Sequence, residues 1–250
     1  MTNAPLDGGK AIARIILDRP EDGNSIDVTV ARAFEESVQS AIRDGSRVLV
    51  LSARGRVFCG GGDVRAMSGA ADPAGYTREL ADTLHRALLA IAESDLIFLC
   101  AVQGAAAGAG FGIILNADYV VASQRASFVT AYLALGVTPD AGTSYLLPRV
   151  AGLRRSTELT LTGRRLAAAT ACDWGLVNEV VSDDALGGRV DEVARTFADA
   201  PPTAVSATKR LLSLSWLPGY REHLAKEASS IAEHIRGAES RELQAAFLNR

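Results

Sequence analysis

The stretch IFLCAV at residues 97–102 is continuously apolar, and the small-residue run GAAAGAGFG follows it at residues 104–112. An apolar run of this length is typical of a strand that is covered on both faces of a sheet. A second apolar run, residues 119–122, lies one short helix further on, and that helix is predicted to begin near Gly108. Strand, helix and strand in this order indicate βαβ layering and therefore an α/β fold.

The alternation of strands and helices extends to both sides of this stretch. Further predicted strands are residues 11–17, 48–52 and 176–181. Predicted helices are residues 28–43, with Asp27 as N-cap, and residues 77–94, which follow a mobile loop at 68–75. From residue 154 on, helical patterns dominate. We expect a core domain of residues 1–195 and a C-terminal helical region of residues 196–250.

Length and composition limit the classes of protein to which the chain can belong. With 250 residues, 48% of them hydrophobic, the chain can bury a large core. A net charge of −3 without any block of Lys or Arg argues against a nucleic acid as partner. Because no apolar run approaches the length of a membrane-spanning helix, no membrane association is expected.

The cysteines and the N-terminus indicate the compartment. Cys59, Cys100 and Cys172 are odd in number, far apart and without the CxxC or Cys/His spacing of a zinc site. Neither a disulfide framework nor a bound metal is therefore expected. Residues 1–10 are polar and glycine-rich, and they lack the apolar core of a targeting peptide. The sequence predicts a cytoplasmic protein.

Two glycine-rich segments each follow a predicted strand. The first is FCGGGD at residues 58–63, and the second is residues 104–112. Glycine lets a backbone approach a ligand closely, and small side chains at a helix start leave N–H groups open to an anionic atom. A tight turn is the alternative for the first segment, and close helix packing for the second. If the segments converge, one N–H from each can bind a carbonyl oxygen as an oxyanion hole.

A dinucleotide-binding loop is a competing interpretation of the second segment. The Rossmann pattern GxGxxG places its third glycine where this chain has Ile113. An acidic residue at the end of the following strand is also missing at the expected spacing. The sequence therefore argues against NAD as a cofactor.

The chain resembles the crotonase, or enoyl-CoA hydratase/isomerase, superfamily over nearly its whole length. Five ordered motifs carry the resemblance: Leu17-Asp18-Arg19-Pro20 with Asn24-Ser25-Ile26, residues 58–63, residues 101–118, residues 135–142 continuing to Leu147-Pro148-Arg149, and Trp174-Gly175-Leu176-Val177-Asn178. The resemblance implies a ClpP/crotonase-like spiral of ββα turns, followed by C-terminal helices that join subunits into a homotrimer or hexamer. The series Leu224, Ala228, Ile231 and Ile235 gives this association a physical reason, since an isolated helical appendage must bury its apolar stripe.

The resemblance also assigns roles to residues. It implies oxyanion-hole donors at Gly60 and Ala109, and an acyl-CoA site in which the coenzyme A thioester is the substrate and no cofactor is needed. The substrate-binding residues that it implies are Asn24, Ser25, Ile26, Gly61, Gly62, Asp63, Val64, Gly108 and Tyr132. The family often has a basic residue just before the asparagine, where this chain has Gly23, so contacts to the adenine end depart from the family pattern.

The acids of the family's hydratases are missing. The resemblance places the two glutamates of a hydratase at Gly112 and Tyr132, and neither residue exchanges protons with water as a carboxylate does, because a phenol has a pKa of about 10 and glycine has no side chain. Hydration by the usual mechanism is therefore not expected. Asp140 lies where dienoyl-CoA and epoxyphenylacetyl-CoA isomerases of the family place an acidic base. One carboxylate beside an oxyanion hole suffices to carry a proton between two carbons.

Several of these residues also have a purely structural interpretation. Asp140 follows a proline and precedes a helical pattern, so a helix cap is the alternative to a base. We interpret Tyr132 as pocket filler rather than as a hydrogen-bond donor, and Asp63 as a brace for its loop. The histidines lie in helical patterns without metal or serine partners, and we interpret them as surface or packing residues: His85, His223 and His234.

Three hypotheses for the function follow. The first is an enzyme that isomerises the double bond of an enoyl-CoA with Asp140 as its base, with the ring chemistry of epoxyphenylacetyl-CoA isomerases as one form. The second is an enoyl-CoA hydratase whose acid and base groups come from other positions. The third is a non-catalytic protein that binds acyl-CoA or acts as a scaffold. We expect the first, because an acid stands at residue 140 and neither glutamate position carries one.

Overall fold

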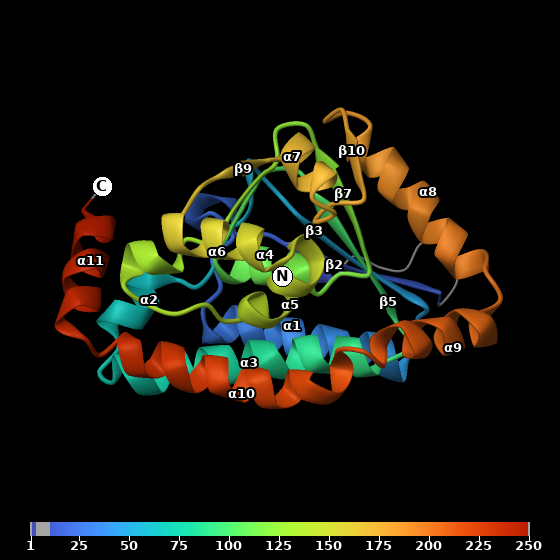
Figure 1. Cartoon of the computed structure of the whole chain (residues 1–250). Coiled ribbons are helices and arrows are strands. Elements are labelled where there is room, and N and C mark those ends of the chain that lie inside the picture. The colour runs from blue at the N-terminus through green and yellow to red at the C-terminus, as the bar shows by residue number, and fades with distance from the viewer. Residues whose placement is uncertain (1, 4–10, 250) are drawn as a thin grey trace.

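Two sheets and a surrounding layer of helices build the molecule, a computed structural model that describes residues 2–3 and 11–249 (Figure 1). The larger sheet has the strand order β1-β2-β3-β5-β7-β10, and the smaller sheet has the order β4-β6-β8-β9. The strands of the larger sheet are Thr2–Asn3, Ile12–Leu17, Val48–Ala53, Ile97–Val102, Tyr119–Ser123 and Glu179–Val181. Those of the smaller sheet are Val57–Cys59, Ala105–Ala107, Ser127–Val129 and Leu166–Ala167.

The chain advances as a spiral that places one strand in each sheet per turn. β3 and β4 precede α2 (Val64–Gly69) and α3 (Pro73–Glu93), β5 and β6 precede α4 (Ala109–Leu115), and β7 and β8 precede the 3-10 helix η2 (Tyr132–Leu135). Strands of successive turns pair in parallel in both sheets. The predicted α/β fold with ββα turns is confirmed.

Local sequence signals locate most helices and the longer strands. They miss the short strands of the smaller sheet, β4, β6, β8 and β9. α1 (Val28–Arg43) begins as predicted after Asp27, whose side chain accepts a hydrogen bond from the backbone N–H of Val30 at 2.7 Å. The loop predicted at residues 68–75 is too long, because α2 reaches Gly69 and α3 begins at Pro73, which leaves only residues 70–72 between the helices. Proline suits the first helical position, since its missing N–H is not needed there.

The C-terminal helices pack back onto the first half of the chain. The remaining helices are η1 (Pro20–Asp22), α5 (Thr143–Ala151), α6 (Leu153–Thr162), α7 (Ala168–Asp173), α8 (Leu186–Asp199), α9 (Pro202–Ser213), α10 (Leu217–His234) and α11 (Ala238–Leu248). In Figure 1, α10 lies along α3, and Leu224, Ala228, Ile231 and Ile235 of the predicted apolar stripe are buried in one core with residues of α3. The chain itself covers this stripe. The sequence-based reason for subunit association at this stripe is therefore wrong.

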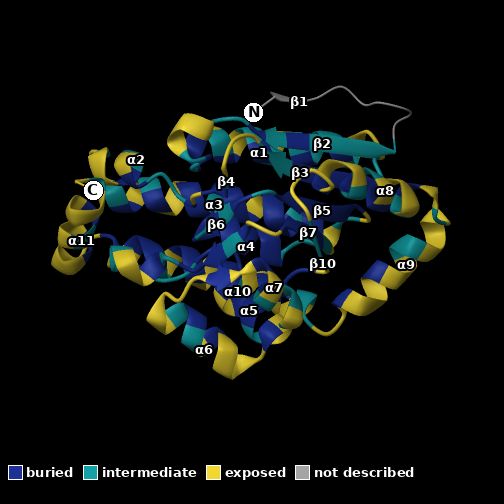
Figure 2. Ribbon diagram, turned by 90° about the horizontal axis from the view of Figure 1, so that it is seen from above, coloured by how far each residue is buried: buried dark blue, intermediate teal, exposed yellow. Residues whose placement is uncertain are grey.

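Exposed residues gather on α6, α9 and α11, at the periphery of the molecule (Figure 2). In the described residues no helix is both long and apolar enough to cross a membrane. The division at residue 195 stays a prediction. The segment 1–10, for which the sequence predicts no targeting peptide, lies outside the described residues apart from Thr2 and Asn3.

Candidate active site

A cavity of about 450 Å³ opens between the two glycine-rich segments. The lining includes nine of the predicted site residues: Ile26, Gly60, Gly61, Gly62, Val64, Gly108, Ala109, Tyr132 and Asp140. Much of the remaining wall is apolar, and it comes from side chains such as Met67, Leu80, Leu84, Ile231 and Phe247. An apolar cavity with a few convergent polar groups is the usual form of a small-molecule site.

The two glycine-rich segments meet because the strands before them pair. β4 and β6 run in parallel, with Val57 opposite Ala105, so their carboxyl ends lie at the same edge of the smaller sheet. Gly61 has a φ of +92°, and a Cβ there would come within 2.8 Å of the carbonyl oxygen of Ala107 and 3.3 Å of the nitrogen of Ala109. Glycine is needed at residue 61 for the conformation and for the close approach.

The prediction that Gly60 donates to the oxyanion is wrong, because its N–H is already hydrogen-bonded. Its N–H donates to the carbonyl oxygen of Gly23 at 2.9 Å and is therefore not available to a ligand. Ile26 pairs around Gly62: its N–H donates to the oxygen of Gly61, and its oxygen accepts from the N–H of Asp63. In such a parallel bridge the N–H of the middle residue, Gly62, points away from the partner strand.

The N–H of Gly62 and the N–H of Ala109 bond to none of the described residues. Both residues line the cavity. Ala109 is the first residue of α4, whose first N–H groups lack partners within the helix. These two groups are the available pair for a ligand oxygen.

Asp140 is a buried carboxyl group, not a helix cap. Its residue is 7% exposed, and the N-cap of α5 is Gly142. The hydroxyl of Tyr132 donates to Oδ1 of Asp140 at 2.8 Å. Burial raises the pKa of Asp140 from 3.8 to about 6, and the bond from Tyr132 opposes that rise. A carboxyl group with this pKa can both accept and return a proton near neutral pH.

Tyr132 is more than the filler that the sequence suggests. Besides Oδ1 of Asp140, its hydroxyl lies 3.2 Å from the carbonyl oxygen of Asp140 and 3.3 Å from Oγ1 of Thr143. Burial and the nearby carboxylate of Asp140 raise the pKa of Tyr132 well above its usual value, so the phenol keeps its proton. Tyr132 therefore acts as a donor that orients the carboxyl group of Asp140.

Side chains from three other elements hold the turn that carries Asp140. Ala141 and Gly142 both have positive φ, at +53° and +77°. The N–H of Ala141 donates to Nε2 of His85 at 2.9 Å, and Nδ2 of Asn116 donates to the oxygen of Ala141 at 3.0 Å. Glu227 of α10 accepts from the N–H of Gly142 at 2.8 Å. These contacts keep Ala141 in a backbone conformation that costs about 1–3 kcal/mol for a residue other than glycine.

Sequence reasoning missed His85, Asn116 and Glu227. His85 is buried, as a packing residue would be, and burial lowers its pKa to about 4, so its ring is neutral. Glu227 had a signal in the sequence. It lies three residues after Leu224 and four before Ile231, and a carboxylate on an apolar helical stripe indicates a buried partner.

Gly112, at the position of the first missing glutamate, has no space for a side chain. A Cβ on Gly112 would come within 2.6 Å of Cβ of Ala141 and 2.8 Å of Oγ1 of Thr143. The turn of Asp140 thus fills the space that a longer side chain at residue 112 would need. Among the described residues that line the cavity, Asp140 is the only carboxylate.

Three predicted substrate-binding residues lie outside the cavity lining: Asn24, Ser25 and Asp63. Nδ2 of Asn24 donates to the carbonyl oxygens of Arg54 and Val57, at 2.9 and 2.7 Å. Asp63 caps α2 by accepting from the N–H of Ala66 at 3.0 Å, and Oγ of Ser25 lies 3.5 Å from Oδ2 of Asp63. Their side chains brace the first glycine-rich segment from behind. Direct contact of these three residues with the substrate stays a prediction.

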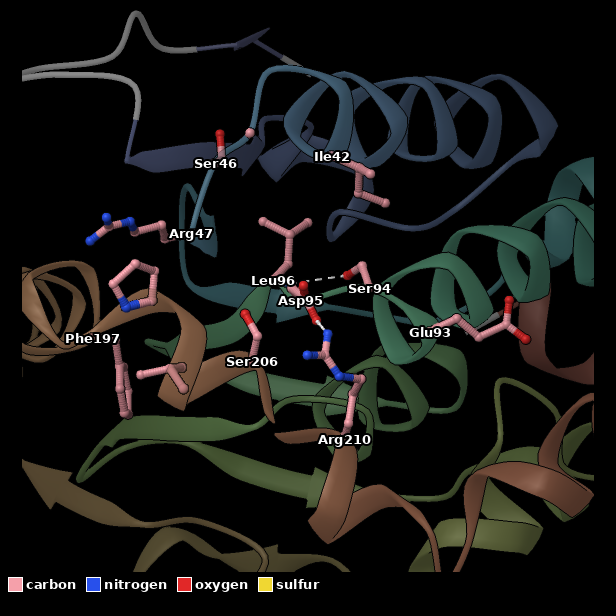
Figure 3. Close-up of a pocket in the computed structure, with 13 residues that line it drawn as sticks. Ile42, Ser46, Arg47, Glu93, Ser94, Asp95, Leu96, Phe197, Ser206 and Arg210 are labelled. Atoms are coloured by element: carbon pink, nitrogen blue, oxygen red, sulfur yellow. Dashed lines mark hydrogen bonds and ion pairs between the residues drawn. The ribbon is translucent and has the colours of Figure 1, made fainter. Parts of the chain in front are cut away.

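A second cavity of about 540 Å³ lies between the C-terminal end of α1, the start of β5 and α9 (Figure 3). In it Arg210 pairs with Asp95 at 2.5 Å, and Arg47 donates to the backbone oxygen of Ala198 at 2.5 Å. None of the predicted site residues in the described part of the chain lines this cavity. The candidate active site is therefore the cavity beside Asp140.

Comparisons with known proteins show which family the chain resembles. The sequence profile of the family described as "Enoyl-CoA hydratase/isomerase" matches residues 7–250. A 1,2-epoxyphenylacetyl-CoA isomerase of Escherichia coli is 34% identical over 209 residues, which cover 82% of this chain and 79% of the relative. A probable enoyl-CoA hydratase of Rhodobacter capsulatus is 34% identical over 241 residues, which cover 96% of this chain and 93% of the relative.

Solved structures show the same fold. An enoyl-CoA hydratase/isomerase from Pseudoalteromonas atlantica superposes with a TM-score of 0.88 at 28% identity, covering 99% of this chain and 97% of that one. An enoyl-CoA hydratase from Mycobacterium avium subsp. paratuberculosis superposes with a TM-score of 0.87 at 27% identity, covering 97% and 99%. The profile match over nearly the whole chain, the relatives and the shared spiral establish that the chain belongs to the enoyl-CoA hydratase/isomerase family of acyl-CoA enzymes, the crotonase superfamily.

Proposed function

We propose that the protein moves the double bond of an enoyl-CoA thioester, with Asp140 as its single proton carrier. One observation carries the proposal: a buried carboxyl group, with a pKa raised to about 6, stands alone among the described lining residues of the cavity that both glycine-rich segments border. A hydratase of this family needs two carboxylates, and Gly112 has no space for one. Relatives named as isomerases and as hydratases match the chain, so their names do not decide between the two reactions.

The proposed reaction is a proton transfer between two carbons of the same chain. The carboxylate of Asp140 removes a proton from the acyl group, and the electron pair moves into the thioester carbonyl to form a dienolate. The N–H groups of Gly62 and Ala109 donate to the dienolate oxygen, and each such donor contributes about 2.7–4 kcal/mol in the transition state. Protonated Asp140 then returns the proton to another carbon, so no cofactor besides the coenzyme A of the substrate is required.

The decisive experiment is an NMR time course of a 3-enoyl-CoA in deuterated water. The wild type should move the double bond, with deuterium entering the product only as far as the carboxyl proton of Asp140 exchanges with solvent before its return. Asp140→Asn should slow the reaction by about 10²- to 10⁴-fold, the usual contribution of a general base. Asp199→Asn, which changes an exposed aspartate at the end of α8, is the matched control and should keep the wild-type rate. Wild-type turnover by Asp140→Asn would exclude Asp140 as the proton carrier.

The other two hypotheses predict different results in the same assay. An unusual hydratase would form 3-hydroxyacyl-CoA from a 2-enoyl-CoA at ordinary rates. A binding protein would hold acyl-CoA thioesters of several chain lengths without converting any of them. Product analysis by NMR and a direct binding measurement therefore distinguish all three.

We also propose that the protein is a cytoplasmic homotrimer or hexamer. The support is an exposed apolar group at the C-terminal end of α9: Leu211 is 68% exposed, Leu212 72% and Leu214 66%. Large apolar side chains that cluster on a surface are typical of interaction sites. The three free cysteines, Cys59, Cys100 and Cys172, suit a reducing compartment.

A further inference from the structure

Glu227 contacts the turn of Asp140 from outside the cavity. It belongs to α10, is 4% exposed, and does not line the cavity. Its Oε2 accepts from the N–H of Gly142 at 2.8 Å, and its Oε1 accepts from the N–H of Ser144 at 2.9 Å and from Oγ of Ser144 at 2.5 Å. All three partners donate, and an ionised carboxylate, which only accepts, suits them better than a protonated one, in which one oxygen becomes a donor.

These contacts replace a helix cap that α5 lacks. The N-cap of α5 is Gly142, which has no side chain to accept from the first N–H groups of the helix. Glu227 supplies the missing acceptor from α10, and its negative charge also suits the start of a helix. Ala141 and Gly142 follow Asp140 directly in the chain. Glu227 therefore holds the backbone two residues after the proposed base.

We propose that Glu227 is a positioning residue for the proposed isomerisation, and that it acts only through Asp140, by fixing the turn that presents this base and by coupling its own ionisation to that of the base. The inference rests on the proposed function of Asp140. It adds a group from the C-terminal helical region, 87 positions along the chain, whose protonation state controls the reaction.

The groups that surround Glu227 determine how it titrates. Asp140 lies on the same turn, His85 faces that turn from α3, and Tyr132 faces it from η2. On α10 itself, Nε2 of His223 lies 3.8 Å from Oε1 of Glu227, and Tyr220 is also close enough to interact with its charge. Burial and then the charge of Asp140 raise the pKa of Glu227 to about 7, while the bonds from Ser144 and Gly142 oppose the rise.

Protonation of Glu227 weakens its hold on the turn that carries Asp140. When Glu227 takes up a proton, one oxygen becomes a donor, and a turn N–H loses its acceptor. The rate should therefore fall in two steps as the pH decreases, first as Glu227 is protonated near pH 7 and then as Asp140 is protonated near pH 6. Because the two carboxyl groups interact, the steps belong to the pair.

The test compares Glu227→Gln with Glu222→Gln, an exposed glutamate on the same helix. A glutamine cannot accept on both atoms, so the turn loosens, and kcat should fall by about 10- to 100-fold, as a misplaced catalytic group does. The Kd of a saturated acyl-CoA should not change, and the upper step of the pH profile should disappear. In the Asp140→Asn background the same substitution should have no further effect on the residual rate. An unchanged kcat in folded Glu227→Gln, or an equal loss in kcat and in binding, would overturn the proposal.

A second variant keeps the test valid if Glu227→Gln does not fold. Ser144 is exposed, and Ser144→Ala removes one bond to the ionised carboxylate of Glu227. This loss raises the pKa of Glu227, so the upper step should move to higher pH while the lower step stays.

Titration of Asp140 by carbon-13 NMR in the resting protein reports the same coupling without turnover. A one-step titration in the wild type would refute the coupling, whereas a two-step titration in a protein that isomerises nothing would refute only the proposed function.

Discussion

Burial makes the carboxylate of Asp140 a stronger base, and the same burial lowers the stability of the folded protein. Its carboxyl group is buried against Tyr132 and has a pKa of about 6 instead of 3.8. A pKa that is higher in the folded than in the unfolded protein means that the folded state binds the proton more tightly. Ionisation of Asp140 therefore lowers the stability of the folded state as the pH rises from about 4 to 6, and the cost persists at neutral pH.

Replacing the buried carboxyl group of Asp140 by a neutral amide should remove this cost of ionisation. Asp140→Asn should raise the free energy of unfolding at pH 8 by up to about 3 kcal/mol, because each pKa unit is worth about 1.4 kcal/mol. The gain should vanish below about pH 3.8, where the carboxyl group is protonated in both states. Urea unfolding at several pH values measures it, with Asp199→Asn as the control. A pH-independent change in stability would show that packing, not ionisation, separates the two proteins.

The ionisation of Asp140 should also set the pH dependence of the wild-type activity. Because the base must be ionised to remove a proton, kcat/KM for a 3-enoyl-CoA should rise with pH through the pKa of Asp140, about 6, and reach its plateau only above the pKa of Glu227, about 7. A pH–rate profile at constant ionic strength measures this rise. A rate that falls over the same range would require a protonated group in place of the proposed base.

A glutamate at residue 112 should not restore hydration. Gly112→Glu restores the residue type of a hydratase but places its Cβ 2.6 Å from Cβ of Ala141. We expect a loss of about 1–3 kcal/mol of stability from overpacking and no gain in hydration. Gly187→Glu on α8, where a Cβ would meet nothing within 4 Å, is the control for a new glutamate. Efficient hydration of a 2-enoyl-CoA by Gly112→Glu would contradict the steric interpretation.

At the scale of elements, the first glycine-rich segment is held by contacts behind it. Asn24 binds carbonyl groups around β4, and Asp63 caps α2, so both organise the wall without touching the cavity. Arg19 joins these braces, with its guanidinium 2.9 Å from Asp27 and 3.9 Å from Asp63. The two aspartates thus cap consecutive helices, α1 and α2, and share one cation.

Because Asp27 and Asp63 both cap a helix, Asp27 is a matched control for a test of Asp63. Asp63→Ala and Asp27→Ala should each lower stability by about 1 kcal/mol, the usual cost of losing an N-cap, and should leave KM within about twofold. Thermal unfolding and steady-state kinetics on both variants measure these effects. If KM rises tenfold or more for Asp63→Ala alone, Asp63 contacts the substrate as the family resemblance implies.

At the scale of the whole molecule, α10 joins the C-terminal region to the spiral. Its apolar stripe covers α3, and Glu227 on its inner face reaches the turn of Asp140, so the helical region completes the environment of the base. Three of the large apolar side chains that remain exposed lie close together elsewhere, at the end of α9. If subunits associate through these helices, the end of α9 is the surface that we expect to be covered.

The corresponding prediction is a change in oligomeric state. Sedimentation of the wild type should give a trimer or hexamer, and Leu212→Glu should shift it toward the monomer, because a charge in an apolar interface is costly to bury. Leu161→Glu on α6, a similarly exposed leucine at 64%, is the control. A monomeric wild type at all concentrations, or an unchanged mass for Leu212→Glu, would contradict this assignment of the interface.

Patterns local in the sequence determined the alternation of strands and helices, the cap of α1 and the places of the two glycine-rich segments in the chain, and the family resemblance supplied the spiral. Periodicity and glycine placement act over a few residues, so they can be read without the fold. Only the tertiary structure decided that Gly60 is already bonded to Gly23, that Tyr132 orients Asp140, and that Glu227 fixes its turn. The physical reason is that burial and the use of each hydrogen-bonding group depend on partners far away in the chain, and the sequence order alone does not specify them.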